Sequence, residues 1–188
     1  MKKIILTLLL TLSLIGAGCG SKDDGKNIQA TTKKEYETDA FSLNPPKNWE
    51  KIETFTKEYP AGVKAGFREP IKDNNFTANI NITTKSVNAN LNSYDFALQE
   101  IKNHENNLKN YLEITREKRT IKIGGNDTDT ILITFEGRQN IENDMNRFLQ
   151  IFATKEGIGY VVTGGLSQDE SSDVQKEIEE SLKSFEIQ

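Results

Sequence analysis

The eight residues from Phe76 to Thr83 alternate strictly between apolar and polar side chains. A period of two residues is that of a β-strand, because successive side chains point to opposite faces of a sheet. Phe76, Ala78, Ile80 and Ile82 fall on one face, and Thr77, Asn79, Asn81 and Thr83 fall on the other. We therefore predict a half-buried strand here, and a sheet whose apolar face must be covered by another layer.

Strands are predicted along most of the remaining sequence. The predicted ranges are 36–43 with a turn at 39–40, 50–55, 62–68, 113–123, 130–137, 148–154 and 158–163. The last two ranges are apolar on both faces, which is typical of central strands. Lys155-Glu156-Gly157 joins them as a tight hairpin, and Gly124-Gly125-Asn126-Asp127 is predicted to be a second turn.

A mid-chain helix is predicted to begin at Asn92 or Ser93, since either residue can cap a helix. Asp95 and Glu100 suit the positive end of its dipole. The apolar stripe, which is weakest at His104, recurs at three- and four-residue steps and consists of Tyr94, Leu98, Ile101, Leu108 and Leu112.

A second helix is predicted at the carboxyl end of the chain. Ser167 and Glu170 have the spacing of a capping box. The helix has an acidic polar face and an apolar stripe made of Val174, Ile178, Leu182 and Phe185. Antiparallel strands interrupted and followed by helices predict an α+β fold, an antiparallel β-sheet flanked by helices.

The amino terminus has the features of an export signal. A basic start is followed by an apolar run over residues 4–15, about twelve residues where a spanning helix needs roughly twenty. Small residues at 16–18 lead into Cys19, and this pattern resembles the lipobox of bacterial lipoproteins, although Gly16 stands where Leu is usual. The resemblance implies a signal peptide over 1–18 and a Cys19 that carries diacylglyceryl and a further acyl chain such as palmitate.

The alternative is an ordinary secretory signal with an incidental cysteine, but an unpaired thiol is unusual in an exported chain. Two or three acyl chains anchor a protein firmly, which predicts attachment to the cell membrane on its extracytoplasmic face. Residues 20–33 are polar apart from Ile28 and cannot offset their ordering entropy by burial. We therefore predict a lipidated tether over 19–34 and a globular domain over 35–188.

Charge and cysteine content limit the function classes. Removing residues 1–18 takes away two of the 24 basic residues and none of the 28 acidic ones, which leaves a side-chain charge of −6. This balance argues against a nucleic-acid partner. The chain has no second cysteine, so the domain depends on its core and not on a disulfide.

A family resemblance rests on residues 41–49, Phe-Ser-Leu-Asn-Pro-Pro-Lys-Asn-Trp. This segment resembles the opening of PsbP-like domains, and the final helix ending in Ser184-Phe185 fits the same plan. The resemblance implies an α-β-α sandwich shared with DcrB-like bacterial lipoproteins, whose members are mostly accessory or binding proteins. The structural alternative for Pro46 and Trp49 is that they simply close an edge of the domain.

No catalytic, metal or cofactor site is predicted. The sequence lacks G-x-S-x-G, H-E-x-x-H and the phosphate-binding G-x-x-x-x-G-K-[ST] pattern. His104 is the only imidazole, and packing at the rim of the sheet is favoured over catalysis for it. Asn126-Asp127-Thr128-Asp129 offers oxygen ligands within the 124–129 turn but lacks the spacing of a calcium loop, so a hairpin is favoured.

Two functions therefore stay open. The favoured one is a non-catalytic lipoprotein of the cell envelope that binds an envelope protein or a small ligand of unknown identity. The alternative is an envelope hydrolase that uses carboxylates only. A concave pocket with converging acids would favour the enzyme, and an open groove or sheet edge would favour binding.

Overall fold

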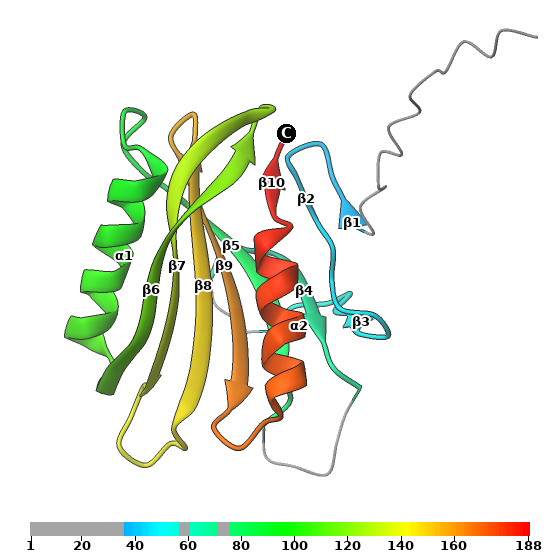
Figure 1. Ribbon diagram of the computed structural model, residues 1–188, viewed down its shortest axis with the longest axis vertical. Helices are drawn as coiled ribbons and strands as arrows, with labels where there is room; N and C mark the ends of the chain where they lie inside the picture. Colours follow the sequence, from blue (N-terminus) through cyan, green and yellow to red (C-terminus); the bar gives the residue numbers. More distant parts are fainter. Residues whose placement is uncertain (1–35, 57–60, 71–75) are drawn as a thin grey trace, which may run out of the picture. The chain divides into compact units, whose positions relative to one another are not determined.

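The computed structural model describes residues 36–56, 61–70 and 76–188, which belong to the compact unit Lys33–Gln188. Ten described strands form one sheet in the order β1-β2-β10-β6-β7-β8-β9-β5-β4-β3. The strands are β1 (Tyr36–Glu37), β2 (Phe41–Leu43), β3 (Glu50–Lys51), β4 (Val63–Arg68), β5 (Asn79–Ser86), β6 (Lys109–Ile123), β7 (Asn126–Arg138), β8 (Asn146–Lys155), β9 (Ile158–Ser167) and β10 (Glu186–Ile187). Two helices accompany them, α1 (Ser93–Asn107) and α2 (Ser172–Lys183) (Figure 1).

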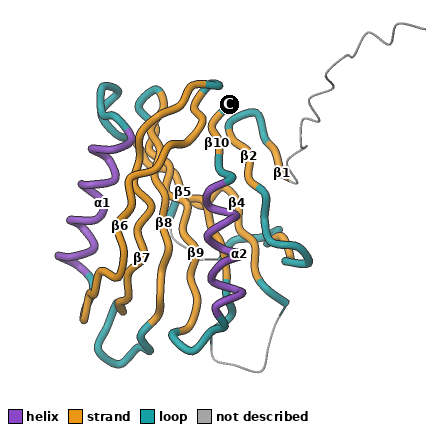
Figure 2. Tube along the Cα trace, viewed as in Figure 1, coloured by secondary structure: helices purple, strands orange, loops and turns teal. Residues whose placement is uncertain are grey.

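In the described part of the chain, strand is more abundant than helix, as Figure 2 shows. The predicted central strands β8 and β9 lie inside the sheet, between β7 and β5. The hairpin that joins them is also confirmed, with positive φ angles of 51° at Glu156 and 78° at Gly157. The strand predicted at 50–55 is shorter than expected, because only Glu50 and Lys51 pair with β4.

The prediction of an antiparallel sheet is correct for all pairs but one. β10 runs parallel to β6, with Glu186 opposite Lys122 and Ile187 opposite Ile123. On its other side β10 is antiparallel to β2. The sheet is therefore mixed, because β10, which comes shortly after α2, lies between β2 and β6.

The two sides of β8 pack against different helices. Leu149 and Ile151 belong to the core under α2, whereas Phe152 belongs to the core under α1. Because alternate residues of a strand point to opposite faces, α1 and α2 lie on opposite faces of the central strands. Each helix covers only part of its face, and β6 leaves Leu112 and Ile114 exposed.

Helix α1 begins where the sequence predicts it to begin. The side chain of Asn92 accepts a hydrogen bond from the backbone amide of Asp95 at 2.8 Å. The predicted apolar stripe is wrong in part, because Leu98 is exposed and Leu112 already belongs to β6. The buried apolar face consists of Phe96, Ala97 and Ile101.

Helix α2 begins later than predicted. Ser167 pairs with Asn146 as the last residue of β9, so its extended backbone cannot cap a helix. Ser171 is the cap, and its Oγ accepts from the amide of Val174 at 3.3 Å. The predicted apolar stripe is confirmed, since Val174, Ile178, Leu182 and Phe185 are all buried.

Glycines of β9 allow both helices to approach the sheet. A Cβ atom on Gly164 would lie 2.1 Å from Cγ2 of Ile178 in α2. On the opposite face, a Cβ atom on Gly159 would lie 2.6 Å from Cζ of Phe96 in α1. A β9 residue without a side chain is therefore required under each helix.

The Pro46–Trp49 turn closes one end of the core. The amide of Trp49 donates to the carbonyl oxygen of Pro46 at 3.2 Å, and the indole packs partly buried against the core. This arrangement agrees with the structural interpretation of these residues.

Candidate ligand-binding groove

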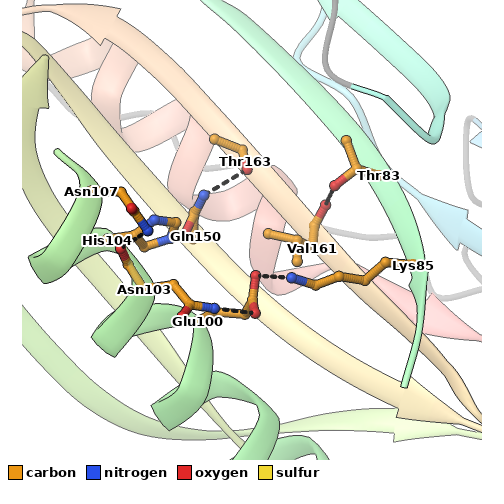
Figure 3. A network of polar contacts seen from close by, with 9 residues as sticks. All are labelled: Thr83, Lys85, Glu100, Asn103, His104, Asn107, Gln150, Val161 and Thr163. Atoms are coloured by element: carbon orange, nitrogen blue, oxygen red, sulfur yellow. Dashed lines mark hydrogen bonds and ion pairs between the residues drawn. The ribbon is translucent and has the colours of Figure 1, made fainter. Parts of the chain in front are cut away.

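The face under α1 carries a row of uncharged polar side chains in the middle of the sheet. The face under α2 carries an ion pair nearer the ends of the strands, where Arg147 of β8 donates to Glu136 of β7 at 2.8 Å and to Oε1 of Gln175 in α2 at 2.9 Å. Gln150 of β8 points to the α1 side and is only 6% exposed. Its Nε2 donates to Oγ1 of Thr163 at 2.9 Å. Its Oε1 lies 2.7 Å from Nε2 of His104, so that three side chains from α1, β8 and β9 form one hydrogen-bonded row (Figure 3).

His104 is held against the sheet by this row and by an aromatic neighbour. Its ring stacks on Phe135 with centroids 5.0 Å apart. Burial lowers the pKa of His104 below its ordinary value of 6.5. The imidazole is therefore neutral at pH 7, with Nε2 donating to Gln150 and Nδ1 left as an acceptor. The prediction that His104 packs on the sheet agrees with this position.

A second polar contact links α1 to β5. Glu100, which is 8% exposed, accepts from Nζ of Lys85 at 2.5 Å and from Nδ2 of Asn103 at 3.2 Å (Figure 3). A carboxylate so deeply placed needs a charged partner, because an unpaired charge is expensive to bury. Glu100 was expected to favour the dipole of α1, but it forms this ion pair across the sheet face instead.

A cavity of about 770 Å³ lies beside these residues. Its floor comes from β5, β9 and β8, one wall comes from α1, and one end comes from the loop between β7 and β8. We call it the α1 groove. Its volume falls within the range of about 300–1,000 Å³ that is usual for small-molecule sites.

The α1 groove has a neutral charge balance. Its charged lining residues are Lys85, Glu100, Arg138 and Asp144, two of each sign. Lys85 and Glu100 neutralise each other. The guanidinium of Arg138 donates to Oδ1 of Asn110 at 2.9 Å and to the carbonyl of Asn143 at 3.2 Å.

A smaller cavity of about 460 Å³ adjoins the α1 groove. Lys85 and Glu100 line both cavities, so their ion pair lies between them. Val87, Leu91 and Gln99 line only the smaller cavity.

The other candidate residues lie elsewhere or outside the described ranges. Asp127 pairs with Lys122, and Asp129 pairs with Lys118, each at 2.8 Å across the β6–β7 hairpin. The favoured hairpin interpretation of the 124–129 turn is thus confirmed by the strand pairing. Cys19 lies outside the residues that the structure describes. Within those residues, no three metal-ligating side chains gather, and no helix has the length and apolarity needed to cross a bilayer.

Sequence reasoning missed Gln150, Thr163 and the buried role of Glu100. One signal was present, since Gln150 is a polar residue inside the run Phe148–Thr154, which otherwise reads as apolar on both faces. A polar side chain in a buried strand needs hydrogen-bond partners, and these partners point to a polar pocket. His104 lies 46 residues away in sequence, so the pairing itself could not be read from spacing.

Comparison with known proteins supports the fold. No protein-family model matches the chain, and no curated protein matches it. Among solved structures, LpqN of Mycobacterium tuberculosis, which is described as involved in cell envelope biogenesis, has a TM-score of 0.51 at 15% identity. The match covers 78% of this chain and 82% of LpqN.

The cyanobacterial PsbP protein CyanoP of Synechocystis sp. PCC 6803 has a TM-score of 0.50 at 16% identity. That match covers 80% of this chain and 88% of CyanoP. At such low identity the likeness concerns the fold alone, and it supports the predicted PsbP-like fold.

Proposed function

We propose that this protein is a non-catalytic binding module whose α1 groove holds a ligand on the outer side of a cell membrane. The observation that carries the proposal is the hydrogen-bonded row of His104, Gln150 and Thr163 along the floor and wall of a 770 Å³ groove. Small-molecule sites typically place a few fixed polar groups among apolar ones. Here Phe135, Phe148 and Val161 supply the apolar part of the lining.

The polar side chains of the row are held in fixed conformations by hydrogen bonds to one another. Gln150 is held by partners at both ends of its amide, so its rotamer is fixed before a ligand arrives. A fixed side chain loses little conformational entropy on binding. The row therefore serves as a rigid recognition element, and this favours binding as its role.

The membrane attachment is proposed from the sequence. Cys19 would carry the acyl chains, and the polar residues 20–33 would serve as the tether expected from the sequence, with a root-mean-square span on the order of 20 Å. The domain would then remain near the bilayer while its groove stays accessible. The envelope role stated for LpqN, which has a similar fold, fits this proposal.

The experiment for the groove is a heteronuclear NMR titration of the purified, isotope-labelled protein with fractions of a solubilised cell envelope. We expect at least one fraction to shift the side-chain amide of Gln150 and the backbone amides of Thr163 and Thr83. Amides of α2 serve as the internal control and should not move. Shifts confined to α2, or no shift with any fraction, would contradict the proposal.

The same samples test the hydrolase alternative. If a component of the fraction is turned over and Glu100→Gln abolishes that turnover, the groove is an active site and the non-catalytic proposal is wrong. We expect no turnover, because Glu100 is neutralised by Lys85 and bound by Asn103.

The experiment for the anchor is metabolic labelling with a fatty-acid analogue. We expect the wild-type chain to take up the label and to fractionate with membranes, and Cys19→Ser to do neither. Equal labelling of the two proteins would refute the lipoprotein assignment.

A further inference from the structure

We propose that the ligand of the α1 groove is an uncharged saccharide, recognised through its hydroxyl groups and one apolar ring face. This inference rests on the proposed binding function and specifies the class of ligand. It is drawn from the arrangement of side chains on the floor of the groove.

The first observation is a polar row that crosses three adjacent strands. Asn81 of β5 lies opposite Thr163 of β9, and Thr163 lies opposite Gln150 of β8. Paired residues share one face of a sheet, and neighbouring strands lie about 4.8 Å apart. The floor therefore presents an amide, a hydroxyl and an amide in line, with His104 as the fourth group on the wall.

All four groups are uncharged at pH 7 and several bonds remain unused. Thr163 accepts from Gln150 but donates its own hydrogen to no atom of the described residues. The half-buried amide of Asn81 has no hydrogen-bond partner among them, and Nδ1 of His104 is an acceptor. The row thus offers donors and acceptors together, which is what a hydroxyl group requires because it donates and accepts at once.

The second observation is a pair of aromatic rings, Phe76 and Phe148, beside the residue of β9 that lies two positions beyond Thr163. Gly165 follows Thr163 on the same face of β9 and lies between Asn79 and Phe148 in register. A Cβ atom on Gly165 would lie 3.4 Å from Cζ of Phe76 and 3.7 Å from Cε1 of Phe148. Two partly exposed rings therefore approach the floor over a residue without a side chain, about 7 Å from the polar row.

A saccharide ring matches this pair of features. Its axial C–H groups form an apolar face that packs on an aromatic ring, and its equatorial hydroxyls lie around the edge, within reach of a neighbouring polar row. An anion would need a cation with free donors beside the polar row, but Lys85 is paired with Glu100, and the guanidinium of Arg138 at the end of the groove already donates to Asn110 and to Asn143. An acyl chain would leave the unbonded amide of Asn81 and the hydroxyl hydrogen of Thr163 facing hydrocarbon, which is unfavourable for polar groups.

The test is isothermal titration calorimetry of the full chain with a defined panel of probes. The panel contains uncharged tetrasaccharides of glucose, mannose and N-acetylglucosamine, a tetrasaccharide of galacturonic acid, inorganic phosphate and palmitate. We expect at least one neutral tetrasaccharide to bind with a Kd below 1 mM and the charged and apolar probes to bind at least 10-fold more weakly.

Two isosteric variants and a control locate the site. Thr163→Val and Asn81→Asp should each weaken saccharide binding at least 10-fold, because they remove a donor with little change in shape. Thr115→Val makes the same change on an exposed position of β6 outside the groove and should leave the Kd unchanged. Circular dichroism spectra and thermal melting curves of all three variants establish that the fold is retained.

The outcomes separate the two proposals. If palmitate, phosphate or the acidic saccharide binds instead, and Thr163→Val weakens that binding, the groove is the ligand site but the saccharide assignment is wrong. If no probe binds while envelope fractions still shift the groove amides, the saccharide assignment fails alone. If a neutral saccharide binds and Thr163→Val and Asn81→Asp have no effect, both proposals fail.

Discussion

The two faces of the central strands have different designs. Under α2 the sheet presents Leu149 and Ile151, and the helix closes on them with Ile178 and Leu182, all four of which are at most 1% exposed. Under α1 the next residue of the same strand is Gln150, and the helix contributes His104 and also Glu100, which pairs with Lys85 of β5. One face is an apolar core that α2 closes over the middle of the strands, with the Glu136–Arg147 ion pair at one end. The other is an apolar core that opens into the α1 groove.

This difference shows how a helix whose apolar contacts end early can leave room for a site. Both helices are seated over a glycine of β9, Gly164 under α2 and Gly159 under α1. Only α2 continues as an apolar stripe along its full length. The apolar contacts of α1 end at Ile101, so beyond that residue the polar row and the cavity take the place of packing.

The largest expected effect comes from two substitutions at adjacent positions of β8, one that places a polar residue on the α2 face and one that places an apolar residue on the α1 face. Leu149→Gln places an unpaired amide in the closed core and should lower the free energy of unfolding by about 4 kcal/mol. Gln150→Leu should change it by about 1 kcal/mol or less, because its two partners face a groove that water can enter. Urea denaturation measures both values, and equal losses would contradict the proposed difference between the faces.

The neighbouring glycines provide a second test of the same comparison. Gly164→Ala forces a methyl group against Ile178 and should lower the stability by about 2 kcal/mol. Gly165→Ala, one residue further on the open face, meets its nearest atom only at 3.4 Å and should be nearly neutral. In an Ile178→Ala background the loss caused by Gly164→Ala should fall to less than half, since the clashing side chain is gone. Additive losses would show that the clash is not the cause.

The open face should also make stability depend on pH. The pKa of His104 is lower in the folded protein than in the unfolded chain because of burial, so the unfolded state binds more protons at acidic pH. Stability should therefore fall as the pH drops from 6.5 through the lowered folded pKa, and it should be unaffected by His104 above pH 7. Two charged groups face the ring: Glu100, which raises the pKa of His104, and Lys85, which lowers it.

His104→Gln should flatten this part of the profile while keeping a hydrogen-bonding side chain beside Gln150. Thermal unfolding of both proteins between pH 5 and pH 8 measures the difference. Parallel profiles would show that the imidazole is not the responsible group.

The smallest effect concerns the start of α2. Ser171→Ala removes the capping oxygen and should lower stability by about 1 kcal/mol. Ser167→Ala should change it by about 0.3 kcal/mol or less, because Ser167 ends a strand and caps nothing. A larger loss of stability for Ser167→Ala than for Ser171→Ala would contradict this assignment and support the capping box expected from the sequence.

Periodicity predicted the elements that depend on local patterns. The alternation at Ala78–Thr83, the β8–β9 hairpin and the stripe of α2 could be read from the sequence, because each reflects neighbours within one element. The expected place of Phe76 is wrong, since Phe76 precedes β5 and lines the α1 groove with Asn81 instead of sharing the face of Ile80. The parallel pairing of β10 could not be predicted in this way, since β10 has only two residues and its partners β2 and β6 are distant in sequence. The buried face of α1 was also misjudged, because Leu98 completes the period but the sheet contacts Phe96 and Ala97 instead.

The groove was beyond sequence reasoning for the same physical reason. Asn81, Thr163 and Gln150 come from three strands, and only their register brings them into line. What the sequence did offer was a polar residue inside an apolar strand. Such a residue indicates that a polar site exists but not where its partners are.

Site-specific photo-crosslinking in living cells tests most directly whether the open face is the binding face. A photoreactive amino acid would replace Gln139, an exposed residue that lines the α1 groove, or Lys176, an exposed residue of α2. Mass spectrometry would then identify adducts on the purified protein. We predict a light-dependent adduct at position 139 and none at position 176. An adduct only at position 176, or equal adducts at both positions, would contradict the assignment of the α1 groove as the ligand site.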